Sequence, residues 1–314
     1  MKRYGYLYEK VYDMDNIALA HKKAKRGKSN YGEVQMVDAN SDKYFTEIHR
    51  MLKDKTFRNS KYEKMIRNEH GKVREIHKLP YYPDRIIHHC IMNIIEDIWV
   101  KSFIKDTWAS IKNRGVHQGV KRIKKALEDE DNTKYCLKMD IKKFYPSCNN
   151  EITKQIIRKK IKDPDLLWLM DEIIDSANGL PIGNYLSQYL GNVYLSDYDH
   201  FVKKQQPYYF RYCDDMVILA KTKEELHKLY QESNVFLKEK LDLTIKDNWQ
   251  IFPLDIRGLD FLGYRFFRKH TLIRKSIVNR FKKKLRQGIT SEALASYGGW
   301  FLWGNTYNLT LKYT

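Results

Sequence analysis

The sequence predicts an α+β fold in which helices surround an antiparallel β-sheet. Two segments carry this prediction. Residues 135–141, YCLKMDI, alternate in polarity, favour β-structure and reach an acid at Asp140. Residues 207–220, PYYFRYCDDMVILA, place aromatic and β-branched residues on both sides of an Asp-Asp centre, which is typical of a strand–turn–strand hairpin with acids at its tip. Helical patterns precede, separate and follow these two segments.

The first part of the chain predicts helices and one loop. Residues 1–70 are polar, basic and rich in tyrosine, with helical periodicity near 41–55 and no Pro/Gly-rich linker. Pro80 and Pro83 then punctuate a loop. The apolar periodicity that follows predicts a buried helix over 85–103, and a second helix is expected over 119–128.

The rest of the chain alternates helices with short strands. The remaining helices are expected at 149–161, 165–176, 185–203 and 223–240. Further β-structure is expected at 243–246 and within GLDFLGYRFF, residues 258–267. The last 45 or so residues predict mostly basic helix.

Composition narrows the classes of partner. Lysine and arginine number 58 against 39 acidic residues, so the net charge is +19 over 314 residues. This balance indicates a polyanionic partner, either nucleic acid or an anionic membrane face. No apolar run approaches the roughly 20 residues that cross a bilayer, so no spanning helix and no membrane partner are expected. The N-terminus has no apolar signal region, which predicts a cytoplasmic protein.

The cysteines argue against a zinc site. Cys90, Cys136, Cys148 and Cys213 are scattered, with no CxxC or CxxH pairing. Such spacing predicts reduced structural thiols and neither a structural metal nor a disulfide framework.

The acids are the strongest candidates for chemistry. An Asp-Asp pair in a turn is ordinary by itself, because aspartate favours turns through local hydrogen bonds. Here the pair Asp214–Asp215 lies between apolar flanks, at the edge of a buried sheet, where like charges are costly unless a cation neutralises them. Asp140 would meet Asp214 if their strands were neighbours in one sheet, and a backbone carbonyl near Ile141 would complete a magnesium site.

Two motifs resemble those of reverse transcriptases. YCDD at 212–215 resembles the YxDD box of that family, and DIKKFYPS at 140–147 resembles its first catalytic block. The resemblance runs from about residue 72 to residue 267. It implies an RNA-directed DNA polymerase shaped like a right hand, with fingers, a palm whose antiparallel sheet carries the aspartates, and a short helical thumb.

The resemblance also implies a division into lobes and a cofactor. The N-terminal region and fingers would span 1–134, the palm 135–267 with a helical insert at 149–203, and the thumb 268–314. Two Mg²⁺ ions, with Mn²⁺ as a substitute, are implied as cofactors. Asp140, Asp214 and Asp215 would be catalytic, and these three together with Ile141 would bind the metals, Asp215 either as a ligand or as an electrostatic supporter.

Further roles follow from the same resemblance. Nucleotide-binding residues would be Lys72 and Arg74 at the triphosphate, Lys246 near the leaving pyrophosphate, and Tyr145 beneath the sugar as a steric gate. Template and primer contacts would come from Lys78, Arg85 and Arg114. The alternatives stay open at this point: each basic residue could be a solvated surface charge, and Tyr145 could be a core aromatic.

One segment indicates a subfamily. GLPIGNYLSQ at 179–188 has Ile182 where most bacterial relatives have glutamine, and Gln188 where they have proline. This pattern resembles reverse transcriptases of diversity-generating retroelements, which copy a template-repeat RNA with errors at adenines. Ile182, Gly183 and Gln188 would then lie at the nucleotide, and the partners would be template RNA, the RNA/cDNA duplex, dNTPs and a helical accessory protein. Ile182 is expected to lower fidelity, although simple packing beneath the palm is an equal alternative.

Two other readings remain open from the sequence. The first is a different bacterial reverse transcriptase, from a retron or an antiphage defence system. The second, from another class, is a non-catalytic RNA-binding protein, because a charge of +19 by itself requires only binding.

Overall fold

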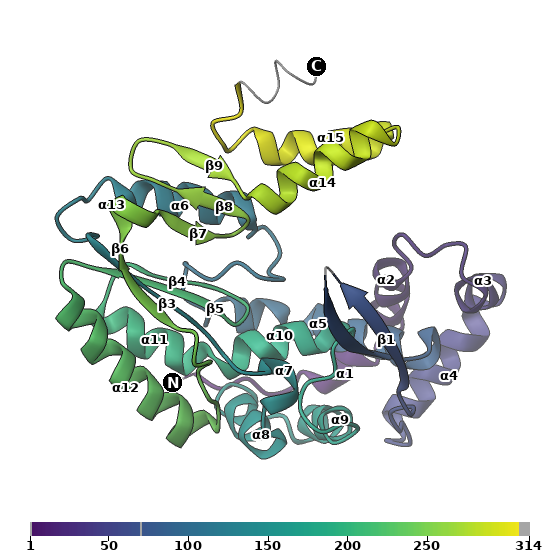
Figure 1. Ribbon diagram of the computed structural model, residues 1–314. Coiled ribbons are helices and arrows are strands. Elements are labelled where there is room, and N and C mark those ends of the chain that lie inside the picture. Colours follow the sequence, from purple (N-terminus) through teal and green to yellow (C-terminus); the bar gives the residue numbers. More distant parts are fainter. Residues whose placement is uncertain (1, 70, 308–314) are drawn as a thin grey trace. The chain divides into compact units, whose positions relative to one another are not determined.

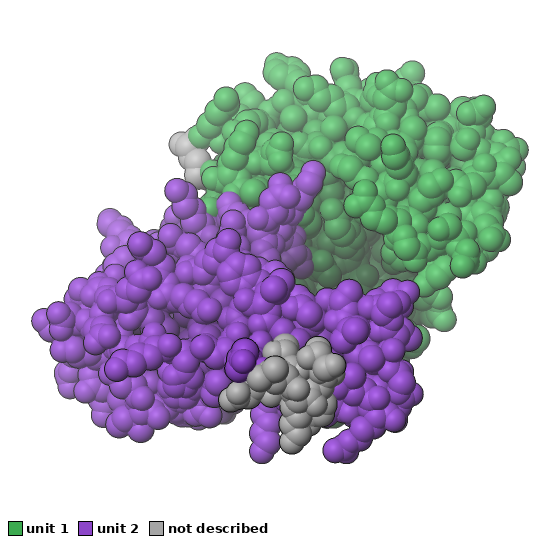
Figure 2. All heavy atoms as spheres, turned by 90° about the horizontal axis from the view of Figure 1, so that it is seen from above, with its two compact units in different colours: residues 1–103, 142–199, 237–243 green, residues 104–141, 200–236, 244–314 purple. Residues whose placement is uncertain are grey.

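The protein is described by a computed structural model that covers residues 2–69 and 71–307. The chain folds as two compact units, between which it passes repeatedly (Figure 2). Unit 1 comprises Met1–Phe103, Lys142–Asp199 and Leu237–Leu243. Unit 2 comprises Ile104–Ile141, His200–Phe236 and Thr244–Thr314.

Unit 1 is helical apart from one β-hairpin (Figure 1). Its N-terminal helices are α1 (Tyr8–Val11), α2 (Met14–Ala24), α3 (Gly32–Ala39) and α4 (Ser41–Lys53). The hairpin β1 (Glu63–Glu69) and β2 (Lys72–Lys78) leads through a short π-helical turn, η1 (Tyr81–Arg85), into α5 (Ile86–Val100). The later helices are α7 (Phe144–Ser147), α8 (Asn150–Arg158), α9 (Pro164–Ile174) and α10 (Tyr185–Tyr194).

Unit 2 is built on two antiparallel sheets. The four-stranded sheet has the order β4-β5-β3-β6, from β3 (Tyr135–Asp140), β4 (Tyr209–Tyr212), β5 (Asp215–Ala220) and β6 (Gln250–Pro253). The three-stranded sheet has the order β7-β8-β9, from β7 (Leu259–Phe261), β8 (Tyr264–Phe266) and β9 (Thr271–Ile273). Its helices are α6 (Val116–Leu127), α13 (Leu254–Arg257), α14 (Lys275–Arg286) and α15 (Ser291–Phe301). Two more helices, α11 (Ser196–Gln205) and α12 (Lys223–Leu241), each run from one unit into the other.

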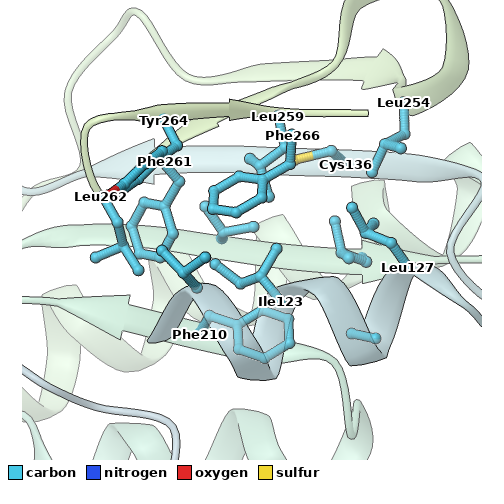
Figure 3. Packing of buried hydrophobic residues seen from close by; sticks show 14 of the residues in the cluster. Ile123, Leu127, Cys136, Phe210, Leu254, Leu259, Phe261, Leu262, Tyr264 and Phe266 are labelled. Carbon is cyan, nitrogen blue, oxygen red and sulfur yellow. The ribbon is translucent and has the colours of Figure 1, made fainter. Parts of the chain in front are cut away.

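The core of unit 2 joins its two sheets to α6. Ile123 and Leu127 of α6 pack with Phe210 of β4 and with Phe261 and Phe266 of the smaller sheet (Figure 3). All five side chains are at most 3% exposed. Removing one of the rings would cost about 3–5 kcal/mol, because the cavity left behind collapses only in part. This packing holds the strands that carry the acids.

The α+β class is confirmed, together with most of the expected elements. The helix predicted over 85–103 is α5, and the one over 119–128 is α6. The sequence indicated a single helix over 185–203, but the chain forms α10 and α11 with a break at Leu195. Residues 258–267 form two strands, because Leu262 and Gly263 turn the chain with φ of 52° and 83°.

One strand prediction was wrong. The structure describes residues 243–246 in full and forms no strand there; only Ile245 makes an isolated bridge, to Ile141. The edge of β3 that such a strand would need is paired at 135–138 by β6, which begins at Gln250. The polarity pattern of residues 243–246 does not show whether another strand already pairs with that edge of β3.

Two further expectations concern membranes and thiols. Within the described residues, no helix is long and apolar enough to cross a membrane. The cysteines are free thiols, as expected, and Cys90, Cys136 and Cys148 are buried. The division into three lobes remains a prediction.

Candidate active site

The sheet of unit 2 brings the acids together. Strands β3 and β5 are antiparallel neighbours, as the sequence analysis expected, and their register places Asp140 directly opposite Asp215. The hairpin β4–β5 closes on the pair Tyr212 and Asp215, so Asp214 lies in the turn. Cys213 takes a left-handed conformation there, with φ of 55°, which makes the two-residue turn possible.

Each of the two opposed aspartates has a lysine beside it. Lys246 donates from Nζ to Asp140 Oδ2 at 2.5 Å, and its main-chain N–H donates to the Asp140 carbonyl at 2.8 Å. Lys138 Nζ lies 3.5 Å from Asp215 Oδ2. These four side chains are 30–34% exposed, so water screens the two ion pairs only in part.

The other oxygen of each carboxylate has no such contact. Asp140 Oδ1 and Asp215 Oδ1 are both buried, and neither has a hydrogen-bond partner within the described residues. A buried, unpaired carboxylate oxygen is costly, and a divalent cation is the ligand that best satisfies hard oxygens of this kind. The donor set therefore fits Mg²⁺ or Mn²⁺.

The acids do not form a closed cage. No set of three or more Asp, Glu, His and Cys side chains within residues 2–69 and 71–307 converges closely enough to enclose a metal ion. Mg²⁺ commonly uses one or two carboxylates and takes its other ligands from water and substrate phosphates. Ile141 forms an isolated bridge to Ile245, and the role of its main-chain carbonyl as a further ligand remains a prediction.

Burial and mutual repulsion perturb the acids in the turn. Burial and, to a smaller extent, the neighbouring charge of Asp140 together raise the pKa of Asp214 to about 6. Burial also raises the pKa of Asp215 to about 6, while Lys138 opposes that rise. Perturbed carboxyl groups of this kind cluster at functional sites.

A basic groove adjoins the aspartates within unit 2. Its volume is about 500 Å³, and besides Asp140 and Asp215 it is lined by Lys138, Asn248, Gln250, Arg257, Arg265 and Arg274, among others. Arg257 lies over the Phe252 ring at 4.6 Å. Sequence analysis missed these residues. The one usable signal was the position of Lys138, two residues before Asp140 and therefore on the same face of β3.

Arg114, the residue of unit 2 that was predicted to contact the template, hydrogen-bonds to the protein's own backbone. Arg114 donates from Nη1 to the Ile104 carbonyl at 2.8 Å, and burial lowers its pKa. It therefore holds the loop between α5 and α6, and a template contact remains a prediction.

The hairpin of unit 1 carries several predicted phosphate contacts. Arg74 on β2 is directly opposite Arg67 on β1, so two guanidinium groups extend from one cross-strand pair. Lys78 pairs with Glu63 at 3.3 Å, and Arg85 is half-buried at the end of η1. The side chain of Lys72 lies outside the part of the chain that the structure describes.

The predicted subfamily segment is tied to this hairpin. The main-chain N–H of His77 in β2 donates to the Ile182 carbonyl at 2.7 Å. Gly183 has φ of 106°, and a Cβ there would lie 2.8 Å from Ile76 Cγ2. Ile182 is half-buried, whereas Gln188 is exposed on α10. Gly183 therefore has a steric reason to be glycine, besides its predicted place at the nucleotide.

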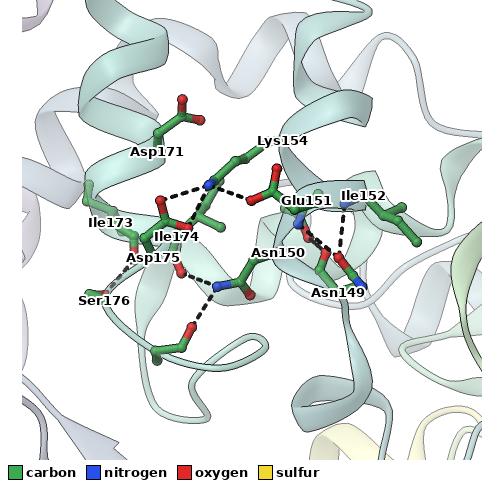
Figure 4. A network of polar contacts seen from close by, with 12 residues as sticks. Asn149, Asn150, Glu151, Ile152, Lys154, Asp171, Ile173, Ile174, Asp175 and Ser176 are labelled. Carbon is green, nitrogen blue, oxygen red and sulfur yellow. Dashed lines mark hydrogen bonds and ion pairs between the residues drawn. The ribbon is translucent and has the colours of Figure 1, made fainter.

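The start of that segment is held by α7 and α8. Asn150 donates from Nδ2 to the carbonyls of Ile174 and Ala177 (Figure 4). Its Oδ1 accepts from the Gly179 N–H at 3.1 Å. The Leu180 N–H donates to the Tyr145 carbonyl at 2.8 Å. Tyr145 itself is half-buried and makes an edge contact with Phe144. Within unit 1, the structure thus brings Tyr145 next to the beginning of the 179–188 segment.

The sheet and its acids define a class of protein. Opposed carboxylates at the ends of neighbouring strands, beside a basic groove, are the arrangement with which nucleic acid polymerases hold two metal ions. The family model described as reverse transcriptase (RNA-dependent DNA polymerase) matches residues 64–266. The chain belongs to this family.

Two curated relatives are similar over part of their length. The chain is 22% identical to Protein YkfC of Escherichia coli (strain K12) over 253 residues, which cover 66% of each protein. It is 24% identical to the group II intron-encoded protein LtrA of Lactococcus lactis subsp. cremoris over 203 residues, which cover 60% of this chain and 33% of LtrA. The chain therefore spans about two thirds of one relative and one third of the other.

Solved structures agree on the fold. Telomerase from Candida albicans, solved with a TWJ fragment of telomeric RNA, superposes with a TM-score of 0.54 at 10% identity, over 79% of this chain and 55% of that one. A C-terminally truncated apo telomerase from Candida tropicalis has a TM-score of 0.51 at 12% identity, over 69% and 55%. At such identities the likeness shows the reverse transcriptase fold alone.

Proposed function

We propose that the protein is a catalytically active reverse transcriptase that copies template RNA into cDNA from dNTPs. The carrying observation is the pair of opposed carboxylates, Asp140 and Asp215, each with a buried oxygen that lacks a partner. Asp140, Asp214 and Asp215, with the carbonyl of Ile141, would hold two Mg²⁺ ions, or Mn²⁺ in their place. Bound there, the ions would activate the primer hydroxyl and neutralise the triphosphate.

The protein's own residues would bind and orient the substrates. The facing pair Arg67 and Arg74 supports a triphosphate contact at the hairpin, because two guanidinium groups on one cross-strand pair offer several donors to phosphate oxygens. Tyr145 would limit the space beneath the sugar. Lys246, which donates to Asp140 in this structure, would bind a phosphate of the substrate as its second anionic partner. The basic groove would receive the RNA/cDNA duplex.

Primer extension on an RNA template tests this proposal. Asp214→Asn removes a charge at the turn, and we expect the rate to fall about 100-fold or more, since electrostatic stabilisation is usually the largest catalytic contribution. Asp131→Asn is the matched control, because the Asp131 side chain is 87% exposed and pairs with Lys134 away from the sheet edge. Activity of Asp214→Asn equal to that of the control would refute the mechanism, whereas a wild-type protein that binds RNA and extends no primer would favour a non-catalytic RNA-binding protein.

The finer proposal is that the enzyme serves a diversity-generating retroelement. It would copy a template-repeat RNA with errors at adenines and would act with a helical accessory protein. The support is the segment 179–188, with Ile182 and Gln188 at the two diagnostic places. The hydrogen bond between Ile182 and His77 adds a route from this segment to the hairpin that carries Arg74.

A second candidate is a reverse transcriptase without adenine mutagenesis. The similarity to LtrA, a group II intron-encoded protein, favours this candidate, which includes retron and antiphage enzymes. Sequencing the cDNA made on one RNA template separates the two. Errors concentrated opposite adenines would support diversification, and errors spread evenly over the four bases would support the alternative.

A further inference from the structure

Lys138 occupies a particular position in the sheet. It precedes Asp140 by two residues in β3, so the two side chains extend from the same face. Across the register Lys138 is opposite Val217, and Asp215 is opposite Asp140, so Lys138 is the diagonal neighbour of Asp215. This geometry places its Nζ 3.5 Å from Asp215 Oδ2.

The ammonium of Lys138 is itself anchored. Nζ donates to the main-chain carbonyl of Asp260 in β7 at 2.6 Å. A main-chain carbonyl in a strand has little freedom, so it fixes a flexible lysine side chain at its tip. Lys138 therefore connects a carboxylate of the four-stranded sheet to the backbone of the three-stranded sheet.

The anchor continues to the start of α14. The Asp260 carboxylate accepts from Arg274 Nε at 2.8 Å and from Arg274 Nη2 at 2.5 Å. The main-chain N–H of Arg274 donates to the Gly263 carbonyl at 2.9 Å, so Arg274 is held at both ends. Arg274 is the residue from which α14 begins. A continuous chain of contacts thus runs from α14 through Asp260 and Lys138 to Asp215.

The lysine on the other carboxylate differs. Lys246 follows an isolated bridge, and its Nζ contacts Asp140 with no second acceptor among the residues that the structure describes. Lys138 instead has the Asp260 carbonyl as a fixed second acceptor. The two lysines are therefore suited to different tasks, Lys246 to exchange between anions and Lys138 to hold one carboxylate in place.

We infer that Lys138 is a positioning residue: it holds Asp215 by Oδ2, so that Oδ1 is directed to the catalytic cation, and Arg274 acts through it. The inference rests on the proposed function, because it assumes a cation at Asp215. Groups that orient a metal-binding carboxylate typically change metal affinity or activity by about 10–100-fold when they are removed. Simple charge repulsion predicts the opposite sign, since deleting a cation near the ligands should tighten cation binding.

Mn²⁺ binding to the full chain distinguishes a loss of cation affinity from a gain. It is measured by electron paramagnetic resonance without nucleic acid or dNTP. We expect Lys138→Met to raise the Mn²⁺ dissociation constant about 10–100-fold, with a parallel fall in kcat and a KM for dNTP within about threefold of wild type. Lys138→Arg should restore most of the affinity. Lys134→Met is the matched control, because Lys134 stands just before β3 and pairs with Asp131 at 3.5 Å.

Arg274→Met tests the connection to α14. Its effect on Mn²⁺ affinity should be severalfold in the wild-type background and should nearly vanish beside Lys138→Met, which is the signature of two residues acting in series. Thermal unfolding of each variant checks that the fold persists. If Lys138→Met does not fold, Lys138→Gln serves in its place, because it is neutral and still able to donate to Asp260.

The outcomes separate the two levels of the proposal. Mn²⁺ binding as tight in Lys138→Met as in wild type, or tighter, would overturn the positioning role while leaving the polymerase assignment intact. If the effects of Lys138→Met and Arg274→Met on Mn²⁺ affinity are additive, Arg274 does not act through Lys138. A wild-type protein that neither binds Mn²⁺ nor extends a primer would overturn the proposed function itself.

Discussion

Gly183 offers a quantitative test of how the 179–188 segment meets the hairpin of unit 1. Gly183→Ala adds one methyl group at a residue whose φ is 106°. The new Cβ would lie 2.8 Å from Ile76 Cγ2 and 3.1 Å from the His77 carbonyl oxygen. Ile76 and His77 both belong to β2, the strand that also carries Arg74 and Lys78.

Two costs add at this position. The left-handed backbone costs an L-residue about 1–2 kcal/mol. Overpacking against β2 adds about 1–3 kcal/mol, because the carbonyl oxygen belongs to a strand and cannot turn aside as a side chain does. Gly27→Ala is the matched control in the same unit, since its φ is 70° and nothing lies within 4 Å of its Cβ. Gly27→Ala therefore incurs only the backbone cost.

Hydrogen exchange reports the difference directly. The His77 N–H donates to the Ile182 carbonyl at 2.7 Å, so its exchange monitors the contact between β2 and the segment. We expect Gly183→Ala to speed this exchange about 10–100-fold, which corresponds to roughly 1–3 kcal/mol, and to raise the KM for dNTP. Gly27→Ala should leave both values near wild type. Adding Ile76→Ala should recover part of the loss by removing Cγ2.

Equal exchange at His77 in the Gly183→Ala and Gly27→Ala variants would refute this reasoning. The backbone of β2 would then have moved aside at no cost, and the glycine would be required by its φ alone. A raised KM with unchanged exchange would instead assign Gly183 directly to the nucleotide, as the sequence resemblance implies.

Three further predictions concern fidelity and pH. Ile182→Gln should lower adenine misincorporation severalfold by restoring a polar contact at the nucleotide; unchanged error spectra in sequenced cDNA would contradict the fidelity role. Burial lowers the pKa of His88 to about 4. Because the unfolded chain binds this proton near pH 6.5, the free energy of unfolding should fall by about 3 kcal/mol as pH drops from 6.5 to 4, and urea unfolding of His88→Gln should lack that part of the dependence. Protons compete with cations at Asp214 and Asp215, whose pKa values are about 6. For each carboxyl group that must lose a proton before the cation binds, the Mn²⁺ dissociation constant should therefore rise about tenfold per pH unit below pH 6. A constant affinity between pH 7.5 and 5.5 would contradict this.

The sequence pattern predicted those elements whose structure depends on residues that are neighbours in the chain. The alternation of 135–141 and the apolar flanks of Asp214 and Asp215 predicted two strands and a turn, because polarity period and turn chemistry are written into neighbouring residues. The adjacency of β3 and β5 was confirmed. The catalytic roles of the aspartates remain predictions that the variants above will test.

Non-local pairing was beyond the sequence. The hairpin β1–β2 was not expected, because strands as charged and exposed as EKMIRNE show no burial pattern. The strand expected at 243–246 does not form, because β6 occupies the edge of β3. In both cases the partner of a strand, which no local pattern reveals, decided the outcome.

The same distinction holds for the charged residues of the candidate site: the positions of the acids could be predicted, but the basic residues beside them could not. Residue types and their order were enough to predict acids at a strand end and at a hairpin tip, in a chain with 58 basic residues. Which basic residues lie beside those acids depends on how the strands pair: the β3–β5 register places Lys138 beside Asp215, and the bridge at Ile141 places Lys246 beside Asp140. An ion pair forms where two side chains arrive within a few ångströms, and that distance depends on how whole strands align, not on the residue types alone.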